Sequence, residues 1–259
     1  MPVDLRGLVA ELDSAVVGRR REVELAVAAI SSARHVVVEG QPGTGKSTML
    51  RAIATSRGVG FEFVEGNAEL TPSRLVGHFD PARVLEEGYD ADVFVDGPLT
   101  RALREGSLLY VEELNRVPEE TLNVLITTMS EREITVPRLG SVRAADGFRL
   151  VAAMNPFDAV GTARISGAVS DRMCRIAVGY QSADDEGAIV RAAASNAAEV
   201  PADFVDRVVE LVRSTRSHPD LRVGSSVRGA IDMVMVADSL AAVRSGDVDA
   251  ARVTLDAAL

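Results

Sequence analysis

The stretch HVVVEGQPGTGKST constrains this chain more than any other part of the sequence. An apolar run from His35 to Glu39 predicts a buried strand, and a glycine-rich turn and a helix follow it. The pattern G-x-x-x-x-G-K-[ST] is satisfied by Gly40, Gly45, Lys46 and Ser47. Glycines let such a loop curl, so that its N–H groups approach phosphate oxygens while the next helix directs its positive end to the same point. The stretch therefore predicts a phosphate-binding loop.

The side chains of this loop predict ATP and Mg²⁺ as ligands. Lys46 is expected to place its charge between the terminal phosphates, and the Ser47 hydroxyl is expected to ligate Mg²⁺. The alternative is a glycine-rich turn that matches the pattern by chance, which the strand before it and the helix after it disfavour. The residues expected to contact the nucleotide here are Gln41, Pro42, Gly43, Thr44, Gly45, Lys46, Ser47 and Thr48.

A second strand ends in two adjacent carboxylates. In SLLYVEELNRVPEE, the apolar residues Leu108 to Val111 run directly into Glu112 and Glu113. Two neighbouring carboxylates are costly to desolvate and repel each other, so a cation is needed, and nucleotide-bound Mg²⁺ would supply it. Because side chains alternate along a strand, the two should point differently. We assign Glu112 to the Mg²⁺ shell and Glu113 to orienting the attacking water; the alternative is a strand that runs into a solvated acidic turn.

The order of the predicted elements favours an α/β fold. Strands are expected at 35–39, 61–65 and 108–111, and in FRLVAAMN and MCRIAVG, with helices between them; this alternation predicts a parallel sheet covered on both faces. Hairpins are expected at EITVPRLGSVRA and near DVFVDGP. After Tyr180 only helices are expected, beginning near Asp184, Ala202 and Ser226. We therefore predict a nucleotide-binding core at 1–180 and a helical domain at 181–259.

Composition narrows the class of protein. With a formal net charge of −10, we expect neither nucleic acid nor an anionic membrane as a partner. One cysteine, Cys174, fits a reducing compartment and is expected in the core, and three histidines make a zinc site an unlikely interpretation. No apolar run approaches the length of a membrane span, and the first residues lack a signal-peptide pattern, so we expect a soluble, cytoplasmic protein.

Taken together, the motifs resemble the MoxR group of AAA+ ATPases over almost the whole chain. The resemblance rests on VVGR at 16–19, GQPGTGKST, LLYVEELNRVPEETLNVLITTMSE, VAAMNPFDAVGTARISGAVSDRM and GSSVRGAIDMV. It implies a P-loop NTPase (AAA+) fold: a three-layer αβα domain with a five-stranded parallel sheet, followed by a small all-α lid. It also implies that Val17 and Gly18 face the nucleotide. One residue departs from the family pattern, because Glu112 stands where the family usually has Asp; its extra methylene would alter the Mg²⁺ geometry and slow turnover.

The resemblance also assigns sensing residues. Asn155 would reach the attacking water or the γ-phosphate, if its strand lies beside that of the phosphate loop; alternatively it caps the turn at Asn-Pro. Arg228, near the start of a lid helix, would contact the γ-phosphate from the same chain and contribute to catalysis; alternatively it is a solvated helix residue. Asn115 and Arg116 would lie near a subunit boundary, although Arg116 can instead pair with Glu119 or Glu120.

Arg172 is the candidate arginine finger implied by the resemblance. It would act on the nucleotide of a neighbouring subunit, where such a finger contributes roughly 10³ to 10⁵ in rate. Arg175 and Arg164 are the other candidates for this role. The alternative for Arg172 is a surface ion pair with Asp171.

The resemblance implies an ATP-hydrolysing homo-oligomer, a hexameric ring, that remodels or matures a client protein complex by inserting a cofactor or metal. Partners with von Willebrand factor A domains are common in this family. The hairpin at 133–147, with Arg138 and Arg143 in it and Arg132 directly before it, would face a pore and contact a client, or would be solvated. A nucleotide-gated assembly switch with little turnover is the main alternative. A small-molecule kinase and a transcription activator or DNA-remodelling relative fit less well.

Overall fold

The computed structural model describes residues 4–155, 167–195, 200–244 and 251–258. Its internal contacts divide the chain into two compact units. The first comprises residues 1–41 and 45–178, and the second comprises 42–44 and 179–259. None of the helices within the described ranges is long and apolar enough to cross a membrane.

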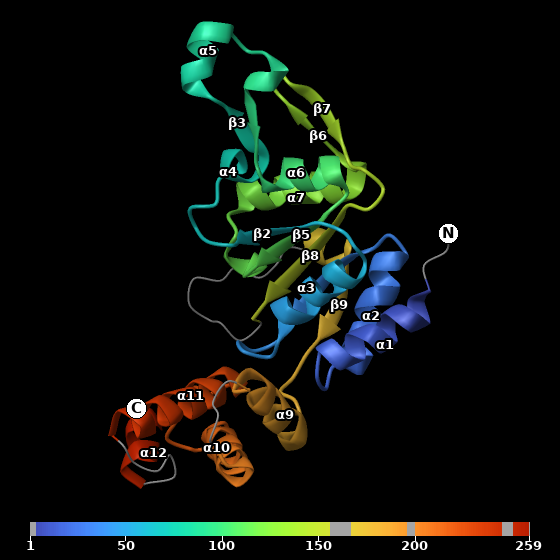
Figure 1. Ribbon diagram of the computed structural model, residues 1–259. Coiled ribbons are helices and arrows are strands. Elements are labelled where there is room, and N and C mark those ends of the chain that lie inside the picture. The colour runs from blue at the N-terminus through green and yellow to red at the C-terminus, as the bar shows by residue number, and fades with distance from the viewer. Residues whose placement is uncertain (1–3, 156–166, 196–199, 245–250, 259) are drawn as a thin grey trace. The chain divides into compact units, whose positions relative to one another are not determined.

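A five-stranded sheet with every neighbouring pair parallel forms the centre of the first unit (Figure 1). The strand order is β2-β5-β8-β1-β9, so β8 lies between β5 and β1. This confirms the predicted five-stranded parallel sheet and the expected position of the FRLVAAMN strand beside that of the phosphate loop. The strands are β1 (His35–Glu39), β2 (Phe61–Glu65), β5 (Leu108–Glu112), β8 (Arg149–Met154) and β9 (Met173–Ala177).

Because all five strands are parallel, their carboxyl ends meet at one edge of the sheet. Backbone hydrogen bonds continue past β1 on both sides: Gly40 donates its N–H to the Met154 carbonyl at 3.1 Å, and Val178 donates to the Glu39 carbonyl at 2.7 Å. We call this the carboxyl edge, and the opposite side, where the strands begin, the amino edge. The phosphate-loop sequence therefore starts from a backbone held on both sides.

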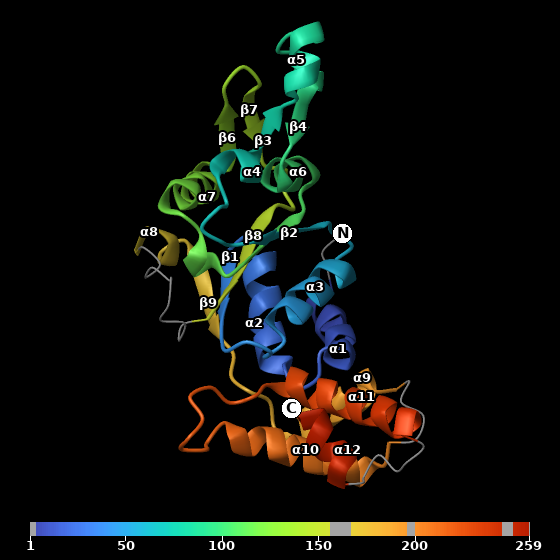
Figure 2. The ribbon, with the colours of Figure 1, turned by 90° about the vertical axis from the view of Figure 1, so that its left-hand side faces the viewer.

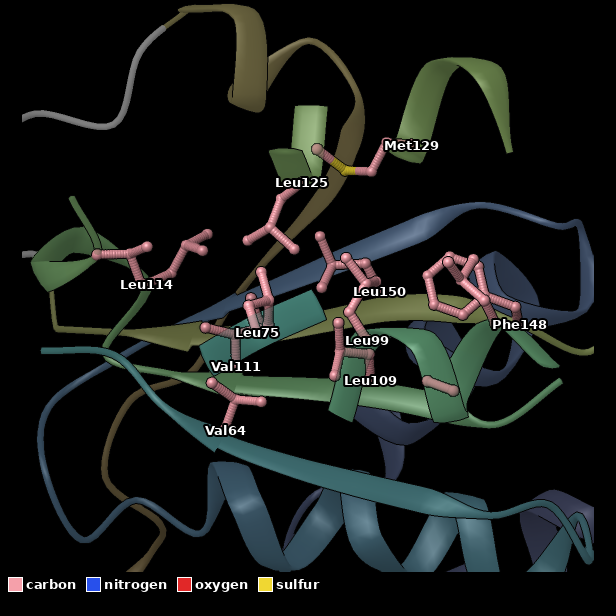
Figure 3. Packing of buried hydrophobic residues seen from close by; sticks show 14 of the residues in the cluster. Val64, Leu75, Leu99, Leu109, Val111, Leu114, Leu125, Met129, Phe148 and Leu150 are labelled. Atoms are coloured by element: carbon pink, nitrogen blue, oxygen red, sulfur yellow. The ribbon is translucent and has the colours of Figure 1, made fainter. Parts of the chain in front are cut away.

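Helices cover both faces of the sheet, as the predicted alternation required. On one face, α1 (Leu5–Ala15), α2 (Arg20–Ser31) and α3 (Lys46–Ser56) pack on alternate strand residues, among them Leu108 and Tyr110. The other face packs against α6 (Pro98–Glu105) and α7 (Glu119–Glu131) through Leu109, Val111 and Leu150 (Figure 3). Figure 2 shows α2 and α3 on one side of the sheet and α7 on the other. Each fully buried side chain of this kind contributes about 1.5–3 kcal/mol.

Two antiparallel strand pairs accompany the five-stranded sheet in the first unit. The first joins β3 (Gly77–Phe79) to β4 (Phe94–Asp96), with α4 (Pro72–Val76), α5 (Pro81–Glu87) and the 3-10 turn η1 (Ala91–Val93) around it. The strand pair expected near DVFVDGP is confirmed: β4 lies in that segment and pairs antiparallel with β3. The predicted second hairpin is confirmed as β6 (Glu133–Val136) and β7 (Gly140–Arg143).

The prediction that Cys174 is a core residue is wrong. Its side chain is exposed. It belongs to β9, an edge strand of the sheet, and an edge strand does not have to be buried on both faces. A short helix, α8 (Gly167–Ser170), precedes this strand.

The second unit contains helices and no strand within residues 179–195, 200–244 and 251–258. These helices are α9 (Ala183–Ala193), α10 (Ala202–Thr215), α11 (Val227–Arg244) and α12 (Ala251–Ala258). Three of them match the predicted helical segments, whereas α12 was not predicted. Their apolar residues form a separate core, beside which buried Glu186 pairs with Arg213 at 3.1 Å and Arg216 at 2.7 Å.

Candidate functional site

The candidate site begins at the loop between β1 and α3. Gly43 and Gly45 adopt left-handed backbone angles, with φ of 73° and 80°, which favour glycine. Lys46, the first residue of α3, folds back so that its ammonium donates to the carbonyl oxygens of Gly40 at 2.8 Å and Gln41 at 2.9 Å. The loop thus holds a cation beside the start of a helix, where backbone N–H groups have no partner within the helix. This arrangement suits an anion such as a phosphate.

Ser47 and Glu112 come together beside this loop. Glu112 is the last residue of β5, and Ser47 belongs to the first turn of α3, which packs on the same face of the sheet. Both side chains line one cleft of about 650 Å³. A hydroxyl and a carboxylate are oxygen ligands of the kind that Mg²⁺ accepts, usually together with water and substrate phosphates, so these donors fit that ion. The cleft is also lined by Glu11, Ala15, Thr48, Arg51, Ala52, Thr55, Ser56 and Phe63.

Glu113 follows β5 in an unusual backbone conformation. Its φ of 51° and ψ of 45° lie in the left-handed region, where a residue other than glycine costs roughly 1–3 kcal/mol. The turn separates Glu113 from the regular alternation of the strand. Its carboxylate forms an ion pair with Arg116 at 3.2 Å, across η2 (Leu114–Arg116). The two adjacent carboxylates therefore have different surroundings: Glu112 lines the cleft, and Glu113 contacts Arg116.

Asn155 follows β8, the strand between those that precede the phosphate loop and the acidic pair. Asn115, which is largely buried, donates its side-chain N–H to the Asn155 carbonyl at 3.5 Å. The structure thus brings the segments that carry Asn115 and Asn155 together at the carboxyl edge. Asn155 is the last described residue before a gap in the description of the chain.

The three candidate arginine fingers lie in different settings. Arg172 is exposed just before β9, and its guanidinium donates to the Ser130 hydroxyl at 2.6 Å and the Ala168 carbonyl at 2.8 Å. Within the described residues it forms no ion pair with Asp171. Arg175 forms an ion pair with buried Glu39, the residue before the phosphate loop. Arg164 lies outside the described residues.

The remaining predicted contacts are distributed over both units. Val17 and Gly18 lie in the turn between α1 and α2, and Gly18 has a φ of 66°. Pro42, Gly43 and Thr44 group with the second unit by their contacts. Arg228 is the second residue of α11 and is exposed. The structure therefore brings Ser47 and Glu112 together within one unit, whereas Arg228 belongs to the other.

Sequence reasoning missed one residue beside the cleft. Tyr110 lies on β5 two positions before Glu112, on the same face of the sheet as α3. Burial, followed by the charge of Glu112, raises the pKa of Tyr110. The signal was present in the sequence, because Tyr110 is the only residue with a polar side-chain group in the run LLYV.

Comparison with known proteins identifies several relatives. Residues 35–173 match the model of the AAA domain family, dynein-related subfamily. YeaC of Bacillus subtilis is 28% identical in an alignment of 264 residues that covers 92% of this chain and 79% of YeaC. The gas vesicle ATPase GvpN2 of Halobacterium salinarum is 31% identical over 237 residues, or 85% of this chain and 66% of GvpN2. Matches to several staphylococcal relatives span 57% of their length.

A solved structure from Cytophaga hutchinsonii has a similar fold. That protein, provisionally described as an ATPase, superposes with a TM-score of 0.59 at 20% sequence identity. The superposition covers 98% of this chain and 84% of the other.

Proposed function

Because the chain belongs to the AAA domain family, in its dynein-related subfamily, we propose that it is an ATP-binding and ATP-hydrolysing ring protein of the MoxR type. Its fold is the P-loop AAA+ fold, and its relatives include a named ATPase. Residues 1–180 would form the nucleotide-binding core and 181–259 a helical lid.

One observation carries this proposal: Ser47 and Glu112, from separate segments of the sequence, line the same cleft directly after the phosphate loop. Mg²⁺ held there would neutralise phosphate charge and orient the phosphates for attack. Lys46 would exchange its two carbonyl partners for phosphate oxygens, to which its charge is better matched. The neighbouring loop residues and Thr48 would contribute further contacts to the nucleotide.

Glu113 and Asn155 would position the attacking water. Both residues directly follow central strands of the sheet, at the edge where the phosphate loop begins. Glu113 would accept a hydrogen bond from the water after its carboxylate leaves Arg116, and the Asn155 amide would hold the water or a γ-phosphate oxygen. The strained backbone of Glu113 supports a functional role, since such strain clusters at active sites.

Arg172 would complete the site of a neighbouring copy. Met173, the next residue, pairs with His35 at the start of β1, whereas Gly40 follows the end of that strand. Five residues of strand separate the two positions, roughly 16 Å at about 3.3 Å per residue. An exposed arginine at that distance is poorly placed to reach the phosphate loop of its own chain. Head-to-tail assembly into a ring would bring it to the next site.

Arg175 is less well suited to this role because its guanidinium already pairs with Glu39 in its own chain.

The second unit would report the state of the nucleotide. Arg228, exposed at the start of α11, would contact the γ-phosphate from the same chain, while Val17 and Gly18 would lie along the nucleotide. Hydrolysis would then change the angle between core and lid. In a cytoplasmic hexamer this motion would remodel or mature a client complex, by inserting a cofactor or metal, with a von Willebrand factor A domain protein as partner.

Replacing Glu113 by Gln tests the hydrolytic part of the proposal. The variant should bind ATP with parental affinity and hydrolyse it roughly 10²- to 10⁴-fold more slowly, the usual contribution of a positioned general base. Lys46→Ala should abolish saturable binding of a fluorescent ATP analogue. Parental hydrolysis by Glu113→Gln would show that another group orients the water. If the parent shows no saturable nucleotide binding, the proposal as a whole fails.

A second candidate function is a nucleotide-gated assembly switch with little turnover. Two features favour it. Glu112 stands where the family that this chain resembles usually has the shorter Asp, and the Glu113 carboxylate already forms an ion pair with Arg116. Hydrolysis measured against protein concentration separates the two functions. A rate per subunit that rises as the protein assembles supports the ring ATPase, whereas a flat, near-zero rate at assembling concentrations supports the switch.

A further inference from the structure

Tyr110 occupies a fully enclosed position behind the Ser47–Glu112 cleft. Its relative exposure is 0%, although it carries a polar hydroxyl. The ring packs against two aromatic side chains of the neighbouring strand β2, Phe61 at 5.4 Å and Phe63 at 5.7 Å between ring centroids. With aromatic rings against it in a close-packed core, the phenol ring has little freedom to turn elsewhere.

The Tyr110 hydroxyl is buried without a hydrogen-bond partner in the part of the chain that the structure describes. An unpaired buried hydroxyl costs about 1–3 kcal/mol, and buried polar groups are nearly always satisfied. Phenylalanine would fill the same space without that cost. The presence of tyrosine at this position therefore calls for a state of the protein in which the hydroxyl has a partner.

Two side chains beside this hydroxyl indicate which state that is. They are Ser47 and Glu112, whose side chains also line the cleft. Tyr110 and Glu112 share one face of β5, and α3, which carries Ser47, packs on that face. The hydroxyl thus lies behind both donors, on the protein side of the cleft.

We propose that Tyr110 is a positioning residue for the cation site: when Ser47 and Glu112 hold a divalent cation with the nucleotide, the Tyr110 hydroxyl donates a hydrogen bond to a Glu112 carboxylate oxygen. This inference rests on the proposed function. A carboxylate on the longer glutamate side chain has one more rotatable bond than aspartate. A fixed donor behind it would select one orientation, as partners behind ligating carboxylates commonly do.

The test is the Mg²⁺ dependence of nucleotide binding in Tyr110→Phe. Binding of a fluorescent ATP analogue is titrated with Mg²⁺, starting from EDTA. We expect parental affinity in EDTA and a rise of roughly five- to tenfold in the Mg²⁺ concentration for half-maximal effect, the loss of one hydrogen bond to a charged group. The melting temperature without ligand should stay level or rise, because the variant removes an unpaired hydroxyl.

Two further variants make the result specific. Tyr89→Phe removes a hydroxyl from a half-exposed ring far along the chain from the cleft and should leave the Mg²⁺ dependence unchanged. In the Glu112→Asp background, Tyr110→Phe should have a smaller effect than in the parent, because the shorter carboxylate withdraws from the hydroxyl; the double-mutant cycle measures this coupling.

The possible outcomes distinguish a failure of this inference from a failure of the proposed function. If the parent binds nucleotide in a Mg²⁺-dependent way and Tyr110→Phe shows the parental Mg²⁺ dependence, the positioning role is wrong and the proposed function stands. Equal effects of Tyr110→Phe in the parent and in Glu112→Asp would also overturn it. If the parent binds no nucleotide, both proposals fail together.

Discussion

The charged side chains at the two edges of the five-stranded sheet have different surroundings. At the amino edge, cationic side chains bond to the protein's own backbone: Arg132 donates to the Ala145 carbonyl at 3.2 Å, and Arg149 donates to the Asp146 carbonyl at 2.9 Å. At the carboxyl edge stand the acidic side chains of Glu39, Glu112 and Glu113, and Glu112 lines an open cleft.

The charged groups at the amino edge bond to the protein itself, whereas Glu112 at the carboxyl edge is available to a ligand. Burial, and then the neighbouring guanidiniums of Arg132 and Arg57, lower the pKa of Arg149, so its charge is held at a cost to stability. Glu112 instead lines an open cleft, and the Tyr110 hydroxyl has no hydrogen-bond partner within the described residues. We therefore expect substitutions at the amino edge to change stability and those at the carboxyl edge to change nucleotide chemistry.

Arg172 is the clearest exception to this expectation, and its substitution should have the largest effect on hydrolysis. It lies at the amino edge, yet it is exposed and its proposed role is in the nucleotide chemistry of a neighbouring copy. Arg172→Ala should reduce hydrolysis by roughly 10³- to 10⁵-fold, the usual contribution of an arginine finger. Steady-state hydrolysis at a protein concentration that supports assembly measures the loss.

Mixing experiments show whether Arg172 acts between copies. Glu113→Gln and Arg172→Ala protomers are each inactive alone, but in a mixed ring some sites would combine an intact Glu113 with an intact Arg172 from the neighbour. Activity should therefore return on mixing. Arg138→Ala, at the tip of the β6–β7 hairpin, serves as an arginine control. No recovery on mixing, together with parental assembly, would place the action of Arg172 within its own chain.

His35 provides the clearest test of the amino edge as a stabilising region. Its Nδ1 accepts the Leu150 N–H at 2.9 Å, and burial, followed by the charge of Arg149, lowers its pKa from 6.5 to about 4. The fold therefore favours the neutral ring. The stability that this contributes is fully present above pH 6.5 and is lost as the pH falls toward 4.

The expected loss can be measured against a variant that does not titrate. Between about pH 7 and about pH 5 the free energy of unfolding should fall by about 2 kcal/mol more in the parent than in His35→Asn, whose amide oxygen can still accept the Leu150 N–H. Denaturant unfolding at several pH values gives the comparison. His78→Asn, at an exposed histidine, should follow the parent. If the free energy of unfolding depends equally on pH in the parent and in His35→Asn, then neutral His35 does not stabilise the amino edge.

Some of the features that these tests address were predictable from the sequence, and others were not. All five strands of the sheet were predictable because each is a short apolar or alternating run bounded by turn residues. The pairing of β1 with β8 was expected only from the family resemblance. Ser47 and Glu112 were predictable as partners because they end or begin elements that meet at one edge. Tyr110 was not, since its significance depends on being buried without a partner, which no local pattern encodes.

Other misses have similar causes. Cys174 was misplaced because an apolar strand sequence does not reveal whether the strand lies at the edge of its sheet. The pairing of β4 with β3 spans α5, so the local pattern near DVFVDGP did not reveal which segment supplies the partner strand. The ion pair between Arg175 and Glu39 links segments more than 130 residues apart, beyond any sequence period.

The smallest expected effect concerns the contact between the β6–β7 hairpin and the segment that joins β3 to β4. The Arg138 guanidinium lies 3.6 Å from the centroid of the Tyr89 ring, which joins the β6–β7 hairpin to the segment after α5. Tyr89 is half-exposed, so this cation–π contact should contribute about 0.5–1 kcal/mol. A double-mutant cycle of Arg138→Met and Tyr89→Leu, read by denaturant unfolding, should show a coupling of that size, with nucleotide binding unchanged in every variant. Weakened nucleotide binding would mean that the hairpins communicate with the carboxyl edge, so the division between a stabilising amino edge and a ligand-binding carboxyl edge would not hold.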